Sequence, residues 1–155
     1  MILSMIDRYV QLCIKRLKLE QILKKSEERH NDDLSNEIKT ELYRLNKSIN
    51  FIHECIMKRL STSTQTALSD LHKLLEYKSK KLIKEISTSQ TTIKMIKDNA
   101  KIAVANRDKN AIKRYKELLE ESESRIKEQL EELNCYDCVA IICSKVQYLS
   151  LKTKN

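Results

Sequence analysis

The stretch IKTELYRLNKSINFIHECIMKRL, residues 38–60, decides the fold. Its aliphatic side chains follow one another at alternating spacings of four and three residues, which is the a/d pattern of a helix that packs against another helix. The residues between them are mostly charged or polar and belong on the solvated sides. The expected helix-packing interface consists of Ile38, Leu42, Leu45, Ile49, Ile52 and Ile56.

This seam needs a cover, either the rest of the chain or a second copy. Isoleucine occupies both a and d positions, mixed with leucine, which allows more than two strands in the bundle. We therefore expect the seam to form either the core within the chain or the interface of an oligomer.

The 155-residue chain contains no glycine and no proline. Without glycine it lacks the residue that most easily adopts positive φ, so tight hairpin turns of the Asn-Gly kind are absent. Without proline it lacks the strongest helix breaker. Sheet-rich folds depend on such residues, whereas helices joined by polar loops do not. The composition predicts an all-α fold.

The absence of glycine also excludes whole classes of function. The phosphate loop of nucleotide triphosphatases, the dinucleotide-binding turn, the nucleophile elbow of hydrolases and the EF-hand loop all require glycine at fixed positions. We can assemble no set of convergent polar groups for catalysis from the remaining residues. We therefore expect a non-enzymatic protein without a cofactor, and no motif assigns the chain to a known family.

Apolar periodicity predicts five or six amphipathic helices in an antiparallel helical bundle with coiled-coil-like character. Polar runs at 30–33, 61–66, 87–92 and 106–110 are the expected joins, because short polar side chains and hydroxyls compete for backbone hydrogen bonds. The last element is expected from Cys138 to about Leu151. We expect a single domain, 1–155, with a helical hairpin at 1–60 and a basic helical bundle at 63–151 as candidate sub-units.

Basic residues are concentrated in one part of the chain. The formal net charge is +8, and Lys73–Lys116 contains thirteen Lys or Arg against four acidic residues, whereas Glu117–Glu132 contains seven Glu against two bases. Such a stretch is typical of surfaces that bind phosphate backbones or anionic lipids. The alternative is a set of solvated helix faces that pair with the acidic stretch. The candidate anion- or nucleic-acid-binding residues are Lys78, Lys80, Lys81, Lys84, Lys94, Lys97, Lys101, Arg107, Lys109, Lys113, Arg114 and Lys116.

The five cysteines, an odd number, indicate reduced intracellular thiols rather than a disulfide framework. Cys135, Cys138 and Cys143 are the candidate metal ligands, with a fourth ligand required from a histidine or a partner. We instead expect them to be buried and inert, and predict no metal site.

No run of apolar residues is long enough to span a membrane, and the N-terminal residues meet Asp7 and Arg8 too early for a secretory signal. We expect an intracellular protein, cytoplasmic or nuclear, that is neither transmembrane nor secreted.

The function expected from these patterns is a structural or assembly role through helix–helix contacts, with a protein partner or as a homo-oligomer. The alternative is a charge-driven binder of RNA, DNA or an anionic membrane surface through Lys73–Lys116. The two hypotheses differ in their salt dependence, because counterion release makes charge-driven binding weaken as salt is raised.

Overall fold

A computed structural model describes residues 2–153. These residues form four α-helices, α1 (Ile2–Glu28), α2 (Asp32–Ser61), α3 (Gln65–Ala105) and α4 (Lys109–Thr153), and include no strand. The all-α prediction is confirmed, and the helices pack together. The predicted number of five or six helices is wrong, because two of the expected joins lie inside α3 and α4.

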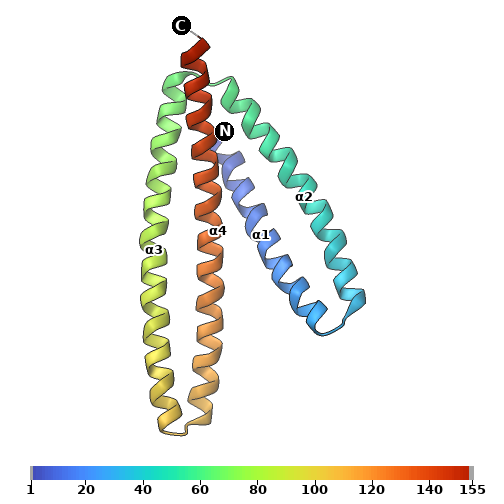
Figure 1. The fold of residues 1–155 in the computed structure, drawn as a ribbon, viewed down its shortest axis with the longest axis vertical. Coiled ribbons are helices and arrows are strands. Elements are labelled where there is room, and N and C mark those ends of the chain that lie inside the picture. The colour runs from blue at the N-terminus through green and yellow to red at the C-terminus, as the bar shows by residue number, and fades with distance from the viewer. Residues whose placement is uncertain (1, 154–155) are drawn as a thin grey trace.

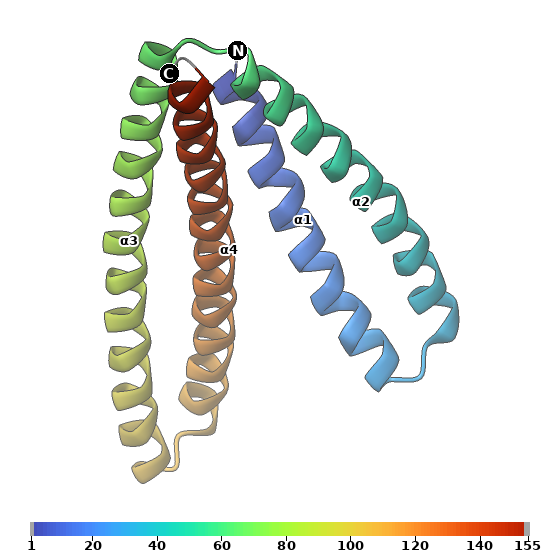
Figure 2. The ribbon, with the colours of Figure 1, turned by 45° about the horizontal axis from the view of Figure 1, so that its top comes forward.

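The four helices are arranged as two antiparallel hairpins, α1–α2 and α3–α4 (Figure 1). The hairpins meet at the end of the molecule that carries both chain termini and diverge towards their turns, as both views show (Figures 1 and 2). Helix α4 lies between α3 and α1 and contacts both. The α3–α4 hairpin is the longer one and projects past the α1–α2 turn (Figure 1). We call residues 87–128, the half of this hairpin nearest its turn, the arm.

The seam of α2 packs inside its own hairpin. Four of its side chains are buried and two, Leu42 and Ile52, are half-buried. Leu45, Ile49 and Ile56 belong to the same core cluster as Ile6, Val10 and Cys13 of α1, and Ile52 packs against this cluster. Burial of one such aliphatic side chain contributes about 1.5–3 kcal/mol, so the seam accounts for much of the stability of this hairpin.

The core continues from this hairpin into the end of the α3–α4 hairpin that lies away from its turn. Helix α3 contributes Leu68, Leu71, Leu75 and Leu82, and α4 contributes Cys135, Tyr136, Val139 and Cys143. Beyond these residues the arm has few fully buried apolar side chains, of which Ala103 is one. The core therefore anchors one end of the molecule and leaves the arm as a two-helix projection.

Both hairpin turns are Schellman motifs built without glycine. His30 and Arg107 each have a φ of 55° at the position that follows the helix. The N–H of the next residue then bonds to a carbonyl five residues back, 3.0 Å from Asn31 to Ser26 and 3.1 Å from Asp108 to Ala103. Both turns fall in polar runs that were expected as joins, 30–33 and 106–110.

Each following helix begins with a side-chain cap. The side chains of Asn31, Thr64 and Asp108 accept the N–H of the residue three positions later, at 3.2, 3.2 and 3.1 Å. The first hydroxyl-rich run thus forms the expected join, because Thr64 caps α3.

The second hydroxyl-rich run, 87–92, was predicted as a join and is a continuous part of α3. Thr88, Thr91 and Thr92 each donate their hydroxyl to the carbonyl four residues back, at 3.1 Å. Their side chains therefore bond within the helix and leave its backbone ladder intact.

The predicted break before Cys138 is also wrong, because α4 runs through it without interruption. Cys135 and Tyr136 are buried against the other helices. The hydroxyl of buried Ser79 donates to Asp137 at 2.9 Å, which joins α3 to α4 at this level. Tertiary packing therefore holds a polar segment in helical form.

Candidate functional site

The twelve predicted basic residues fall into two groups. Lys78, Lys80, Lys81 and Lys84 lie in the first half of α3, beside the core. The other eight lie at the end of α3 and the start of α4, residues 94–116, which we call the arm tip (Figure 1). The structure thus does not produce one continuous stripe.

The first group is partly neutralised within the fold. The ammonium of Lys78 lies 3.4 Å from the Asp7 carboxylate and 5.2 Å from the centre of the Tyr136 ring. Lys80 pairs with Glu76 at 3.8 Å on the same helix. These contacts agree with the alternative interpretation of the basic stretch, in which its charges pair with acidic residues of the same helix or of a neighbouring helix.

The arm tip differs, because its basic residues are exposed and unpaired. All eight are exposed, and the ion pairs found within residues 2–153 involve none of them. Asp108, one of the few acids at the tip, accepts the N–H of Ala111 at 3.1 Å as the cap of α4. The tip therefore presents a concentrated positive charge, carried by Lys94, Lys97, Lys101, Arg107, Lys109, Lys113, Arg114 and Lys116.

Exposed aliphatic side chains accompany this charge. Met95, Ile102 and Val104 are 61%, 60% and 60% exposed, whereas Ala103 between the last two is buried. Val104 also borders a shallow groove with Ala100 and Leu119 in which Lys94, Lys97 and Lys101 form part of the lining. The tip therefore combines cationic and apolar groups.

The acidic stretch of α4 faces α1 as well as solvent. Glu128 pairs with Lys18 of α1 at 3.4 Å. Further along, Glu120 and Glu123 line a cleft whose opposite wall contains Lys24 and Lys25. The positive charges near these glutamates thus come from α1 and from Lys127 of α4 itself, and not from the arm tip.

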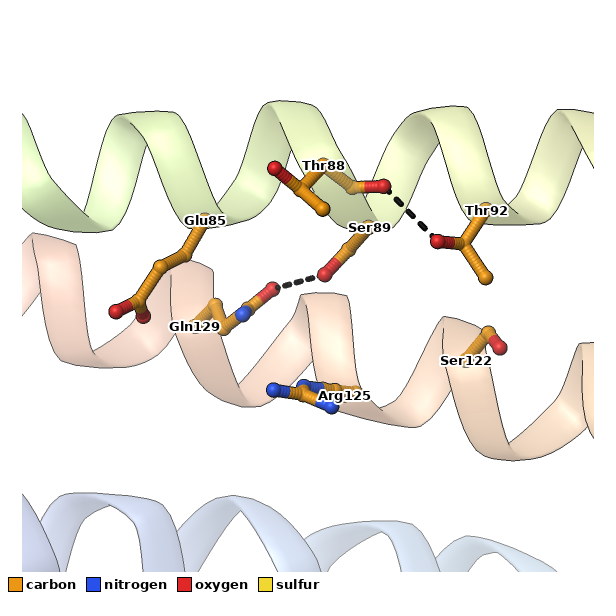
Figure 3. A pocket seen from close by; sticks show the side chains of 7 residues that line it. All are labelled: Glu85, Thr88, Ser89, Thr92, Ser122, Arg125 and Gln129. Atoms are coloured by element: carbon orange, nitrogen blue, oxygen red, sulfur yellow. Dashed lines mark hydrogen bonds between the residues drawn. The ribbon is translucent and has the colours of Figure 1, made fainter.

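A small polar groove lies between α3 and α4 in the arm (Figure 3). Ser89 donates its hydroxyl to the amide oxygen of buried Gln129 at 3.0 Å. The other lining side chains are Glu85, Thr88, Thr92, Ser122 and Arg125. This convergence was not predicted from the sequence, because residues 87–92 were expected to form a join between two helices. The lining has no histidine, cysteine or carboxylate pair with which to start acid–base or nucleophilic chemistry.

The cysteines predicted as metal ligands do not come together. Cys138 is exposed, and Cys143 is buried and donates its thiol to the Leu68 carbonyl at 3.3 Å. Along a helix, eight residues rise about 12 Å, which separates Cys143 from Cys135. None of His30, His53 or His72 completes a cluster with them; His53 stacks on Tyr9 with ring centroids 5.9 Å apart.

Cys135 instead meets Cys13 of α1 and Glu131 of α4. The two thiol sulfurs and a carboxylate oxygen all lie within 4.8 Å of one another. A hydrogen bond from the Cys135 thiol, together with the charge of Arg16, lowers the pKa of Cys13 to about 7. The same bond and burial raise the pKa of Cys135. Sequence spacing could show Glu131 and Cys135 on one face of a helix, but not the approach of Cys13 from another helix.

Comparison with protein-family models, curated proteins and solved structures finds no match to this chain. Within the described residues, no helix combines the length and the apolar character needed to cross a bilayer.

Proposed function

We propose that this is a non-enzymatic binding protein that attaches to an anionic membrane surface through the arm tip. The observation that carries the proposal is the group of eight exposed basic residues without an ion-pair partner among the described residues. Each basic residue near an anionic leaflet contributes about 1 kcal/mol of attraction, so eight are enough for strong but salt-sensitive attachment.

The exposed aliphatic side chains favour a membrane over a nucleic acid as the anionic partner. Met95, Ile102 and Val104 can enter the boundary between headgroups and acyl chains, which adds a hydrophobic term that phosphate backbones do not offer. The aromatic residue of the tip, Tyr115, is half-buried and so is poorly placed to stack on a base.

The projecting shape supports the same proposal. The tip lies at the end of the molecule opposite the shared core (Figure 1). Contact at the tip therefore leaves the α1–α2 hairpin free for other partners. We place this surface inside the cell, in the cytoplasm or nucleus, because the five cysteines are free thiols and the cytoplasmic leaflet is anionic.

Co-sedimentation with vesicles tests the proposal. The protein should bind phosphatidylcholine vesicles that contain phosphatidylserine, bind pure phosphatidylcholine weakly, and lose binding as salt is raised. The combined variant Lys97→Glu, Lys101→Glu, Lys113→Glu should lose binding. The control Lys58→Glu, Lys73→Glu, Lys145→Glu has the same net charge, with exposed residues outside the tip, and should retain it. Equal loss in both variants contradicts a specific role of the tip, and preference for RNA or duplex DNA over vesicles would make nucleic acid the partner.

A second candidate function is assembly through helix–helix contacts. Leu130, Ile141 and Tyr148 are 49%, 57% and 64% exposed and recur at spacings of eleven and seven residues on one face of α4. A second copy or a partner helix could cover this stripe. Light scattering after size-exclusion chromatography tests it: a mass above 18.2 kDa that Ile141→Glu returns to the monomer value supports assembly, and a monomer at all concentrations contradicts self-assembly.

A further inference from the structure

We infer that Cys13, Glu131 and Cys135 form a binding site for a divalent metal ion of the zinc class, which joins α1 to α4. The inference is independent of the proposed membrane attachment, because the site lies in the core end and not in the arm tip.

The geometry of the three ligand atoms is close to that of a zinc site. Zinc binds thiolate at about 2.3 Å and carboxylate at about 2.0–2.2 Å, so ligand atoms of one tetrahedral site lie about 3.5–3.8 Å apart. The two sulfurs and the carboxylate oxygen lie within 4.8 Å of one another. Small side-chain adjustments therefore suffice to bring them into a first coordination shell.

Two helices hold these ligands in place. Glu131 and Cys135 are one turn apart on α4, so both point to the same side of that helix, and Cys13 approaches from α1. Cys13 and Cys135 are only 1% and 4% exposed. Glu131 is half-buried, so this side of the cluster is partly accessible to solvent, from which a water molecule would supply the fourth ligand.

The donor set selects the metal. Two thiolates disfavour magnesium and calcium, which prefer oxygen ligands, and favour zinc, cobalt and cadmium. Two thiolates and one carboxylate exceed the charge of the metal ion by one negative charge. Arg16, one turn from Cys13, supplies a compensating positive charge and is oriented by a 3.2 Å hydrogen bond to Asn46 of α2. Arg16 would therefore support the ligands through its charge.

A metal at this point would fix the two hairpins to each other. The cluster joins α1, which belongs to one hairpin, to α4, which belongs to the other. Beyond it the hairpins diverge (Figure 1). Metal binding would thus stabilise the contact between the hairpins in addition to each hairpin alone.

Cobalt titration of the reduced, metal-free protein tests the site. One Co²⁺ per chain should bind, with a near-ultraviolet thiolate-to-cobalt band and the visible bands of tetrahedral coordination, and Zn²⁺ should displace it. Cys13→Ser and Cys135→Ser should each weaken binding by more than about 100-fold, and Arg16→Gln by about tenfold. Cys138→Ser is the matched control, because this cysteine is exposed on the same helix, and it should leave the spectrum unchanged.

Glu131→Gln tests the contribution of the carboxylate to metal binding separately from that of the two thiolates. It should keep the thiolate band, change the visible bands and weaken binding. Thermal melts provide a readout that does not depend on a cysteine variant: Zn²⁺ should raise the melting temperature of the wild-type protein, because it binds only the folded state tightly. Absence of stoichiometric cobalt binding by the folded wild type, or an unchanged spectrum in Cys13→Ser and Cys135→Ser, overturns the inference. A Cys13–Cys135 disulfide in a protein whose reduced form binds no metal overturns it as well.

Discussion

The ammonium of Lys18 lies 3.4 Å from the carboxylate of Glu128, and this pair ties α1 of one hairpin to α4 of the other. The two side chains are 55% and 37% exposed. An exposed ion pair contributes at most about 1 kcal/mol, because water and salt screen it. Lys18→Ala should therefore lower the free energy of unfolding by less than about 1 kcal/mol in urea denaturation, and a loss above about 2 kcal/mol would contradict this view of the hairpin contact.

Ile49 should be far less tolerant. Its side chain is 4% exposed in the centre of the α1–α2 seam. Ile49→Asp buries an unpaired charge and removes apolar contact, so it should lower the free energy of unfolding by about 4 kcal/mol. Circular-dichroism melts measure the effect, with Asn50→Asp at the exposed neighbouring position as the control. An unchanged melt for Ile49→Asp would show that this residue is not buried.

The turn between α1 and α2 should gain stability from glycine. His30 has a φ of 55°, a conformation that costs a residue with a Cβ about 1–2 kcal/mol. His30→Gly removes this conformational cost in the folded protein. Part of the resulting gain in stability is lost, because glycine also increases the conformational freedom of the unfolded chain. We expect a net increase of about 1 kcal/mol in the free energy of unfolding. His30→Ala keeps a Cβ and should show no such gain, so equal effects of the two variants would argue against the left-handed conformation.

Glu132 should make stability depend on pH. Burial and the nearby Glu85 raise the pKa of its carboxyl in the folded protein. The folded protein therefore favours the protonated carboxyl of Glu132. The stability that this carboxyl contributes is fully present below its pKa in the unfolded chain, about 4.3, and is lost as pH rises through its higher pKa in the folded protein.

Glu132→Gln removes this titration. Relative to wild type, the variant should gain stability in urea denaturation as pH rises above the unfolded pKa, about 4.3, and the gain should level off once the folded carboxyl is ionised. The comparison removes the titration of carboxyls that do not interact with Glu132, whereas Glu85 and Asp7 do interact with it. A difference between variant and wild type that stays constant with pH, or that reverses in direction, would contradict the raised pKa.

The fold class was predictable because the relevant signals are local. The absence of glycine and proline indicated helices, and the spacing from Ile38 to Ile56 indicated the packing face of α2. The number of helices was not predictable from the same signals. The hydroxyls of Thr88, Thr91 and Thr92 can cap a new helix or bond within an existing one, and the choice depends on the packing of α3 against α4.

The candidate sites were predictable in part. The basic stretch was visible in the sequence, but which of its residues form ion pairs, as Lys78 and Lys80 do, depends on which acids lie close in space. The meeting of Cys13 with Cys135 involves the first and last helices, which only the packing of the two hairpins brings together. Spacing patterns within one helix do not contain that information.

The central claim is that the arm tip contacts an anionic membrane, and a single introduced tryptophan tests it most directly. The chain contains no tryptophan, so Ile102→Trp provides an isolated fluorophore at the tip. Tyr148→Trp provides the control, because Tyr148 is 64% exposed and lies near the opposite end of the molecule. With phosphatidylserine-containing vesicles, emission from Ile102→Trp should shift to shorter wavelength and that from Tyr148→Trp should stay unchanged. An unchanged spectrum from Ile102→Trp, or a shift confined to Tyr148→Trp, would contradict the account.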